Sequence, residues 1–279
     1  MMGMIREGVK AIWNQKWALG MLYLLHLGFG AVVGSRMQAA LREALGSSAA
    51  GTQLVRAYDS DVMADLTRHE GLDLGVVASS GGLALVIFLA VGILLYGGLI
   101  HNIITTQNGL RSILTGGTRH FLSFAVVSLA VALLIVLATS IIWVPFLSIS
   151  GAPPLTGALE VYHSEKQFFF AAGAILCLCY AVILLISSWG IVSKANIVSG
   201  KSKPCRLAAS LVVKNWWRIL LFGLLTVVIA AFSIWILSLL RNMVTGHLAA
   251  HFIVGQCIVI ALCKLRIWYI GGVASLTST

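Results

Sequence analysis

The sequence predicts an all-α polytopic membrane protein, a bundle of six transmembrane helices with short interfacial helices, formed as a single domain over residues 1–279. The chain is 59% hydrophobic and only 10% charged, whereas soluble domains carry about a quarter charged residues. Its six apolar runs have about 18 residues or more, the length that crosses a bilayer as a helix. The basic residues stand at the ends of these runs, so the net charge of +10 does not indicate nucleic-acid binding.

The first span is predicted over about residues 17–34, after a basic N-terminal segment, 1–16. This apolar run is longer than that of a signal peptide, so we predict that it is retained as a membrane span. It contains Gly30 and Gly34, a GxxxG pair that lets another helix approach closely.

The next segments alternate between polar surface elements and spans. Residues 35–75 contain six of the nine acidic residues and are predicted as a small helical cap on the outer surface. The second span follows over about 76–104, and a short amphipathic piece at 109–117 leads into the third span, about 120–144.

The second half of the chain repeats this alternation. An outer loop precedes the fourth span, about residues 168–192, and the fifth and sixth spans are predicted over about 213–240 and 247–271. Spans two and three and spans four and five share the unit of span, inner surface helix and span. This similarity indicates either a pseudo-symmetric bundle or a chance likeness of two hairpins.

A basic loop, residues 192–218, separates the fourth and fifth spans and contains no acidic residue. Ser202 and Pro204 suit a helix start, and the following residues form one apolar stripe, so we expect an interfacial helix. Its charges should attract anionic lipid headgroups or an acidic partner, with about 1 kcal/mol for each basic residue near the surface. The basic residues of the loop are Lys194, Lys201, Lys203, Arg206, Lys214 and Arg218.

The distribution of charge predicts the orientation. Four segments are predicted on the same side as the basic loop: 1–16, 101–120, 193–218 and 264–279. They contain 13 of the 19 Lys and Arg residues and only one of the nine acidic residues. Because basic residues are enriched in cytoplasmic loops, we predict that both termini and the basic loop are cytoplasmic. The expected location is the bacterial cytoplasmic (inner) membrane.

Polar residues inside spans are costly and are therefore candidates for function. His26 lies in the middle of the first span and could bind haem or a pigment, or instead form a hydrogen bond with a neighbouring span. Gln256 and Lys264 lie in the sixth span, and Lys264 is close enough to its inner end to extend its ammonium toward water. His247 and His251 are four residues apart, a spacing that can hold a metal, but solvated histidines are the simpler interpretation.

The basic loop also carries a family resemblance. Residues 196–218 resemble the basic loop of bacterial six-span integral membrane proteins that are grouped with the membrane domain of glycerophosphodiester phosphodiesterases. Gln256 and the Lys264-Leu-Arg266 sequence are similar to the last span of related proteins. The resemblance covers about residues 90–279, and the catalytic domain of that family has no counterpart here. It therefore implies a fold and a membrane location, and no activity.

Three functions agree with these features. The first is a non-catalytic accessory or scaffold subunit, bound to other membrane subunits and to anionic headgroups, with no cofactor. The second is a transporter or lipid-handling protein, and the third is a haem- or pigment-binding subunit that uses His26. We expect no enzyme, because the sequence has no phosphate-binding loop, no serine nucleophile motif and no carboxylate pair in a span.

Overall fold

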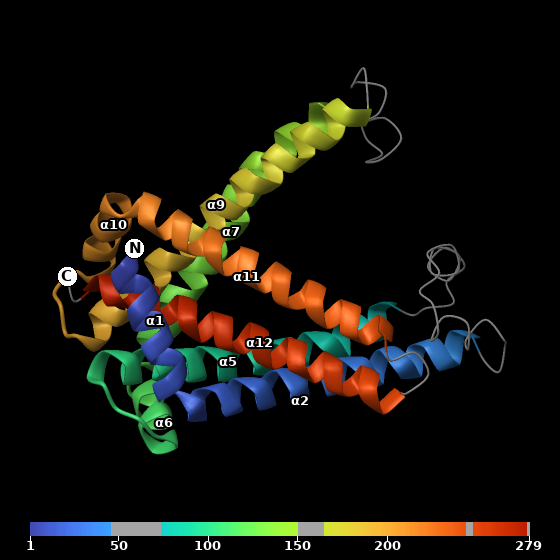
Figure 1. Ribbon diagram of the computed structural model, residues 1–279, viewed down its shortest axis with the longest axis horizontal. Coiled ribbons are helices and arrows are strands. Elements are labelled where there is room, and N and C mark those ends of the chain that lie inside the picture. The colour runs from blue at the N-terminus through green and yellow to red at the C-terminus, as the bar shows by residue number, and fades with distance from the viewer. Residues whose placement is uncertain (46–73, 150–164, 244–247, 278–279) are drawn as a thin grey trace. The chain divides into compact units, whose positions relative to one another are not determined.

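The computed structural model describes residues 1–45, 74–149, 165–243 and 248–277. Within these ranges the chain is helical apart from short turns, so the all-α prediction is confirmed. The helices, drawn in Figure 1, are α1 (Met2–Asn14), α2 (Lys16–Leu45), α5 (Leu74–Thr105), α6 (Leu110–Arg119), α7 (Phe121–Ile149), α9 (Glu165–Val198), α10 (Pro204–Lys214), α11 (Trp216–Met243), α12 (Leu248–Ala274) and the 3-10 helix η1 (Ser275–Thr277). Most of the predicted cap at 35–75 lies outside the described residues.

Six of these helices are long and apolar enough to cross a membrane, so the chain is a multi-pass membrane protein. Their positions agree with the six predicted spans, with small shifts at the ends. The fourth span is part of α9, which continues to Val198, six residues beyond the predicted end of the span. The fifth span begins at Trp216, in α11, because the residues up to Lys214 belong to α10. The six spans are Lys16–Arg36, Gly82–Thr105, Phe121–Val144, Phe170–Val198, Trp216–Leu240 and Phe252–Thr277.

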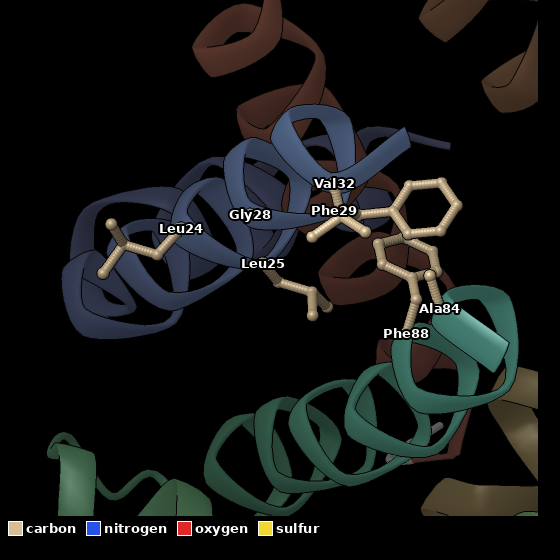
Figure 2. Close-up of a pocket in the computed structure, with 7 residues that line it drawn as sticks. All are labelled: Leu24, Leu25, Gly28, Phe29, Val32, Ala84 and Phe88. Atoms are coloured by element: carbon tan, nitrogen blue, oxygen red, sulfur yellow. The ribbon is translucent and has the colours of Figure 1, made fainter. Parts of the chain in front are cut away.

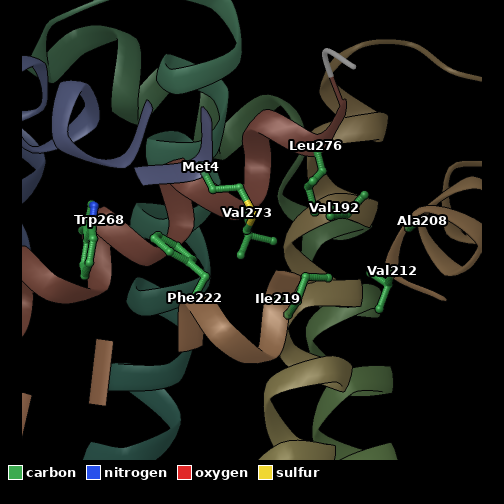
Figure 3. Close-up of a cluster of buried hydrophobic side chains, with 9 residues drawn as sticks. All are labelled: Met4, Val192, Ala208, Val212, Ile219, Phe222, Trp268, Val273 and Leu276. Carbon is green, nitrogen blue, oxygen red and sulfur yellow. The ribbon is translucent and has the colours of Figure 1, made fainter. Parts of the chain in front are cut away.

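The chain divides into two compact units, Met1–Leu19 with Ile93–Thr279, and Gly20–Gly92. In the first unit, the core lies where α1, α10 and the last turns of α12 meet α9 and α11. Phe222 of α11 is fully buried there, with its ring 4.9 Å from that of Trp268 and stacked on Tyr269 at 5.7 Å. Figure 3 shows the residues of this core: Met4, Val192, Ala208, Val212, Ile219, Phe222, Trp268, Val273 and Leu276. We call this part of the first unit the α10 end.

Helix α1 is a feature that the sequence analysis did not predict, because residues 1–16 were expected to be only a basic segment before the first span. It packs tightly against α12 through small residues. A Cβ added to Gly271 would stand 2.5 Å from the Ala11 side chain, and one added to Gly8 would stand 2.6 Å from the carbonyl oxygen of Trp268. Trp268 also donates its indole N–H to the carbonyl of Ile5 over 3.3 Å.

Helices α5 and α6 also approach closely, and α6 confirms the short amphipathic piece predicted at 109–117. Gly98 of α5 lies against the carbonyl of Ile113, and Gly117 of α6 lies against the carbonyl of Leu94. The backbones can come this close because neither glycine carries a side chain.

Away from the α10 end, the spans of the first unit expose most of their side chains. Helices α7 and α9 run side by side (Figure 1), with Val131 packed on Gly190. Farther along this pair, Val136, Ile141 and Leu176 are exposed. In a bilayer these apolar surfaces face lipid chains or other membrane helices.

The second unit covers Gly20–Gly92, and its described residues belong to α2 and α5. Phe88 of α5 packs against two rings of α2, with its centroid 4.4 Å from Phe29 and 5.4 Å from His26. These aromatic contacts hold the two helix segments together within this unit.

Candidate functional site

Helix α10 matches the interfacial helix predicted in the basic loop. It begins at Pro204, and its preceding residue is Lys203 in a left-handed conformation (φ 57°), without a side-chain cap from Ser202. Ala208 and Val212 are buried in the core, so the apolar stripe faces the protein. Exposed basic residues lie on α10, just before it and at the start of α11, and we call them the basic face: Lys201, Lys203, Arg206, Lys214 and Arg218.

Hydrogen bonds fix α10 to the rest of the first unit. The amide of Asn196 donates to the carbonyl of Pro204 over 3.1 Å, and the indole of Trp189 donates to the carbonyl of Cys205 over 3.0 Å. The Lys201 ammonium donates to the carbonyl of Thr277 over 3.0 Å. The basic face is therefore held on a packed support and does not belong to a free loop.

Two exposed tryptophans follow α10. Trp216 and Trp217 begin α11 with their rings 5.4 Å apart, and 49% and 58% of their surfaces are exposed. Tryptophan is enriched at the level of the lipid headgroups, where one part of the ring is apolar and the other polar. Their position beside the basic face fits contact with a membrane surface.

Lys194, the first basic residue predicted for the loop, lies elsewhere. It belongs to α9, is half-buried, and donates a hydrogen bond from its ammonium to the Ser128 hydroxyl over 2.7 Å. Arg266 belongs to α12 and contacts α5 instead. The Arg266 guanidinium stands 4.2 Å from the centroid of the Tyr96 ring, a cation–π contact.

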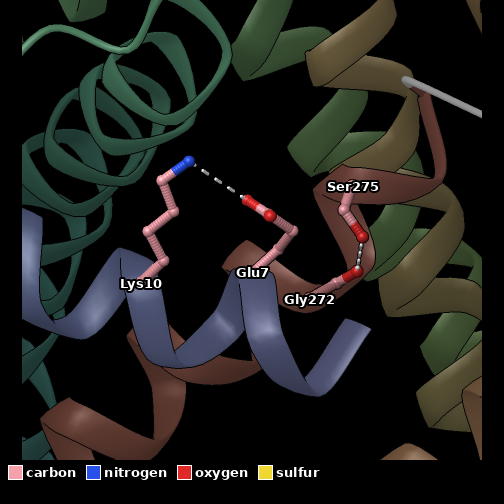
Figure 4. Close-up of polar contacts among 4 residues, drawn as sticks. All are labelled: Glu7, Lys10, Gly272 and Ser275. Atoms are coloured by element: carbon pink, nitrogen blue, oxygen red, sulfur yellow. Dashed lines mark hydrogen bonds and ion pairs between the residues drawn. The ribbon is translucent and has the colours of Figure 1, made fainter. Parts of the chain in front are cut away.

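The carboxylate of Glu7 lies on α1, paired with a different cation. Among the residues whose side chains the structure describes, Glu7 is the only acidic one, and it lies 3.9 Å from the Lys10 ammonium on the same face of α1 (Figure 4). Nearby, the Ser275 hydroxyl donates to the Gly272 carbonyl over 2.7 Å at the end of α12. Within that described set, Lys194 and Arg266 therefore have no carboxylate partner.

A polar cluster that the sequence did not indicate joins the residue between α1 and α2 to α5 and α6. Gln15 and Asn102 are both buried. The Asn102 amide donates to the Gln15 side-chain oxygen over 3.4 Å, and the Ser112 hydroxyl lies 2.6 Å from the Asn102 side-chain oxygen. The Gln15 amide continues the cluster to Asn108 over 3.1 Å.

This cluster borders an open cavity of about 130 Å³, to which Glu7 and Lys10 also contribute. Buried amides need hydrogen-bond partners, and this network supplies them. Only the polarity of Gln15 and Asn102 at helix ends could have indicated the cluster from the sequence.

His26 uses one ring nitrogen within its own helix. Its Nδ1 lies 2.7 Å from the Leu22 carbonyl oxygen, and since a carbonyl only accepts, Nδ1 carries the proton. The hydrogen bond thus stays within α2 and does not reach a neighbouring span. Nε2 is left as the nitrogen that could bind a metal, so the predicted cofactor role stays a prediction that an absorption spectrum of the purified protein tests.

An apolar groove of about 230 Å³ lies near His26 in the second unit. Figure 2 shows the aromatic rings of Phe29 and Phe88 together at one end of the groove. Its lining residues are Leu24, Leu25, Gly28, Phe29, Val32, Ala84 and Phe88. Among the described residues, the structure holds no group of three or more His, Cys, Asp or Glu side chains that could bind a metal.

The remaining predicted residues lie in α12. Lys264 is exposed and Gln256 is half-buried. Lys264 lies near the middle of the span Phe252–Thr277, so its predicted extension to water at the inner end stays a prediction. His247 lies outside the described residues, as does the side chain of His251, so their predicted proximity stays a prediction.

Comparison with known proteins found no family, no curated protein and no solved structure that matches this chain. The likeness to the membrane domain of glycerophosphodiester phosphodiesterases therefore stays a prediction from the residues quoted above.

Proposed function

We propose that this protein is a non-catalytic accessory or scaffold subunit of a complex in the bacterial cytoplasmic membrane, with a basic face that binds anionic lipid headgroups. The observation that carries the proposal is the seating of α10. Its apolar side is buried through Ala208 and Val212, while its basic residues are exposed beside Trp216 and Trp217. A basic, amphipathic helix next to interfacial tryptophans suits a headgroup layer.

The orientation follows from the α10 end together with the rule for basic residues. Met4 near the N-terminus and Leu276 near the C-terminus belong to the same core as α10. The two termini and the basic face therefore lie on one side of the membrane in this proposal. Because Lys and Arg are enriched in cytoplasmic segments, we assign that side to the cytoplasm.

The use of glycine supports a role that involves partner helices. In the first unit, Gly8, Gly98 and Gly271 lie where added side chains would meet neighbouring atoms. Within the second unit, by contrast, a Cβ at Gly30 or Gly34 would meet nothing within 4 Å. Small residues let membrane helices approach closely, so the predicted GxxxG pair offers a surface to another subunit.

The subunit proposal is tested by purification from native membranes in a mild detergent. We expect one or more membrane proteins to co-purify in fixed proportion, and Gly30→Leu with Gly34→Leu should reduce their amount. Gly3→Leu is the control, because a Cβ at Gly3 also meets nothing within 4 Å but lies outside the spans. Recovery of the wild-type protein alone would refute this part of the proposal.

Headgroup binding is tested separately, by native mass spectrometry of the purified protein with phosphatidylglycerol or phosphatidylcholine. Changing Lys203, Arg206 and Lys214 to Gln removes three charges, at about 1 kcal/mol each, so phosphatidylglycerol binding should weaken by about two orders of magnitude. Lys16→Gln with Arg111→Gln is the control, since both residues are exposed and lie outside the basic face. Equal phosphatidylglycerol retention by the triple variant and the control would contradict the assignment.

A further inference from the structure

The cavity of about 130 Å³ in the first unit lies between α1 and the last turn of α5. Sites for drug-sized ligands have about 300–1,000 Å³, so this cavity suits one small group. Seven of its nine lining residues are polar, whereas the groove near His26 is lined by apolar residues. The cavity is therefore suited to a polar group.

This cavity is placed where two membrane spans end. The first span begins at Lys16, directly after the lining residue Gln15, and the second span ends at Thr105, three residues after the lining residue Asn102. At 1.5 Å per residue, Asn102 lies about 4.5 Å along the helix from that end. Lipid headgroups and water-soluble compounds both reach this depth.

The buried amides that line the cavity have no N–H group left for a ligand. Gln15 donates to the Gln107 carbonyl over 3.2 Å and to the Asn108 side-chain oxygen over 3.1 Å. Asn102 donates to the Gln15 side-chain oxygen over 3.4 Å and to the Gly109 carbonyl over 3.5 Å. Since a side-chain amide has two N–H donors, all four are used. The Gln15 oxygen accepts this single long bond among the described residues and keeps a lone pair for a donor.

Two further features favour a positive charge in the cavity. The last turn of α5, with Asn102 and Ile103 in the lining, is the negative end of the helix dipole. The Glu7 carboxylate is half-exposed and stands 3.9 Å from the Lys10 ammonium (Figure 4), which leaves its oxygens free to accept hydrogen bonds. The group that fits these acceptors is a primary ammonium, which carries one charge and three N–H donors.

Donors for an anionic group line the same cavity. The Lys10 ammonium makes no hydrogen bond within the described residues, because its distance from Glu7 is too long for one. The Asn108 oxygen accepts from Gln15, which leaves the two N–H groups of Asn108 available. A phosphate offers several acceptor oxygens to such donors at once. Glu7 and Lys10 thus suit the two opposite charges of a zwitterion.

We propose that this cavity binds a phosphoethanolamine group, with its ammonium beside Glu7 and Gln15 and its phosphate beside Lys10 and Asn108. The trimethylammonium of choline has no N–H donor and cannot replace it. The group belongs either to phosphatidylethanolamine or to soluble O-phosphoethanolamine. This site goes beyond the proposed function, because the basic face binds anionic headgroups and shares no residue with the cavity.

The first test compares headgroups on the wild-type protein, purified in detergent. Native mass spectrometry measures binding of phosphatidylethanolamine and of phosphatidylcholine with the same acyl chains. A second arm measures O-phosphoethanolamine and phosphocholine by calorimetry. The ethanolamine form should bind about tenfold or more tightly than the choline form in at least one arm, as expected for charge-assisted hydrogen bonds that choline cannot make.

The second test uses variants of the two exposed charges. Glu7→Gln should reduce the preference for ethanolamine by about tenfold, whereas Glu7→Asp keeps the charge and should retain most of it. Lys10→Gln should weaken the ethanolamine and choline forms alike, because both carry the phosphate. Arg6→Gln is the matched control, an exposed cation of α1 that does not line the cavity.

The outcomes assign the source or reject the site. A preference confined to the lipid arm identifies a lipid headgroup, and a preference in the soluble arm shows that phosphoethanolamine binds without acyl chains. Equal binding of the ethanolamine and choline forms by the wild type in both arms overturns the proposal without any variant. A preference as large in Glu7→Gln as in Arg6→Gln also overturns it, as does unchanged or tighter binding by Lys10→Gln. The basic-face variant should keep the preference, so its loss of phosphatidylglycerol tests the proposed function alone.

Discussion

Gly98→Ala should weaken the contact between α5 and α6 and thereby destabilise the first unit. The added methyl group would overlap the carbonyl oxygen of Ile113 and stand 2.7 Å from its carbonyl carbon. Ordinary contact begins at about 3.4 Å, so α6 would have to move by several tenths of an ångström or more. Its backbone cannot turn aside as a flexible side chain would.

The magnitude follows from two opposing contributions. Overpacking of a tight contact costs about 1–3 kcal/mol, whereas replacing glycine by alanine inside a helix gains about 1 kcal/mol. Gly92→Ala in the same helix gives the second contribution alone, because a Cβ there meets nothing within 4 Å. The free energy of unfolding of Gly98→Ala should therefore be about 1–3 kcal/mol below that of Gly92→Ala.

The assay is thermal unfolding in detergent, followed by the loss of the monodisperse peak in size-exclusion chromatography. For a chain of 150–250 residues 1 kcal/mol corresponds to about 2–4 °C, so Gly98→Ala should melt several degrees below Gly92→Ala. Equal melting temperatures would show that α6 does not pack on α5 through Gly98, and would refute the close contact of these two helices.

Three further perturbations test other parts of the fold. Phe222→Ala should lower the free energy of unfolding by about 3–5 kcal/mol, because this ring is fully buried, whereas Phe232→Ala, at a ring that is 59% exposed, should have little effect in a melting assay. Asn102→Ala should cost about 1–3 kcal/mol because it leaves the groups bound to this buried amide without a partner, and equal stability of variant and wild type would argue against the polar cluster. Burial and then the Arg119 charge lower the pKa of His120, so the unfolded chain takes up the proton first and stability should fall as the pH drops below about 6.5. His120→Gln should reduce this loss in melting curves recorded between pH 7.5 and pH 5.5, and an unchanged pH dependence would exclude a contribution from this residue.

The sequence was most informative where local composition decides the structure. The six spans were predicted within a few residues because their length and apolarity are properties of continuous segments. Helix α10 was predicted because Pro204 and an apolar stripe are local signals of a helix and of its buried side.

The candidate site could be predicted only in part. The basic face was expected from the run of Lys and Arg residues, but Lys194 was assigned to the same loop because the end of α9 was placed six residues too early. Its hydrogen bond to Ser128 crosses 66 residues of sequence. The contact between Arg266 and Tyr96 likewise joins helices α12 and α5, and no spacing rule in one segment predicts such a pair.

The N-terminal helix was missed for a related reason. Met4, Gly8 and Ala11 have helical spacing and are buried, but the charges around them favoured interpretation as a basic tail. The segment is a packed helix because its small, buried residues fit against the surface of α12. The indole of Trp268 and the carbonyl of Ile5, for example, are 263 residues apart in sequence.

By itself, the sequence determined that this protein is helical, crosses a membrane six times, and carries a basic surface helix. These properties depend on the free energy of transferring continuous segments between water and lipid. The tertiary structure decided that α1 packs on α12, that Gln15 and Asn102 share a hydrogen bond, and that Lys194 donates to Ser128. These contacts depend on shape and charge at the surfaces of distant helices, which become neighbours only when the chain has folded.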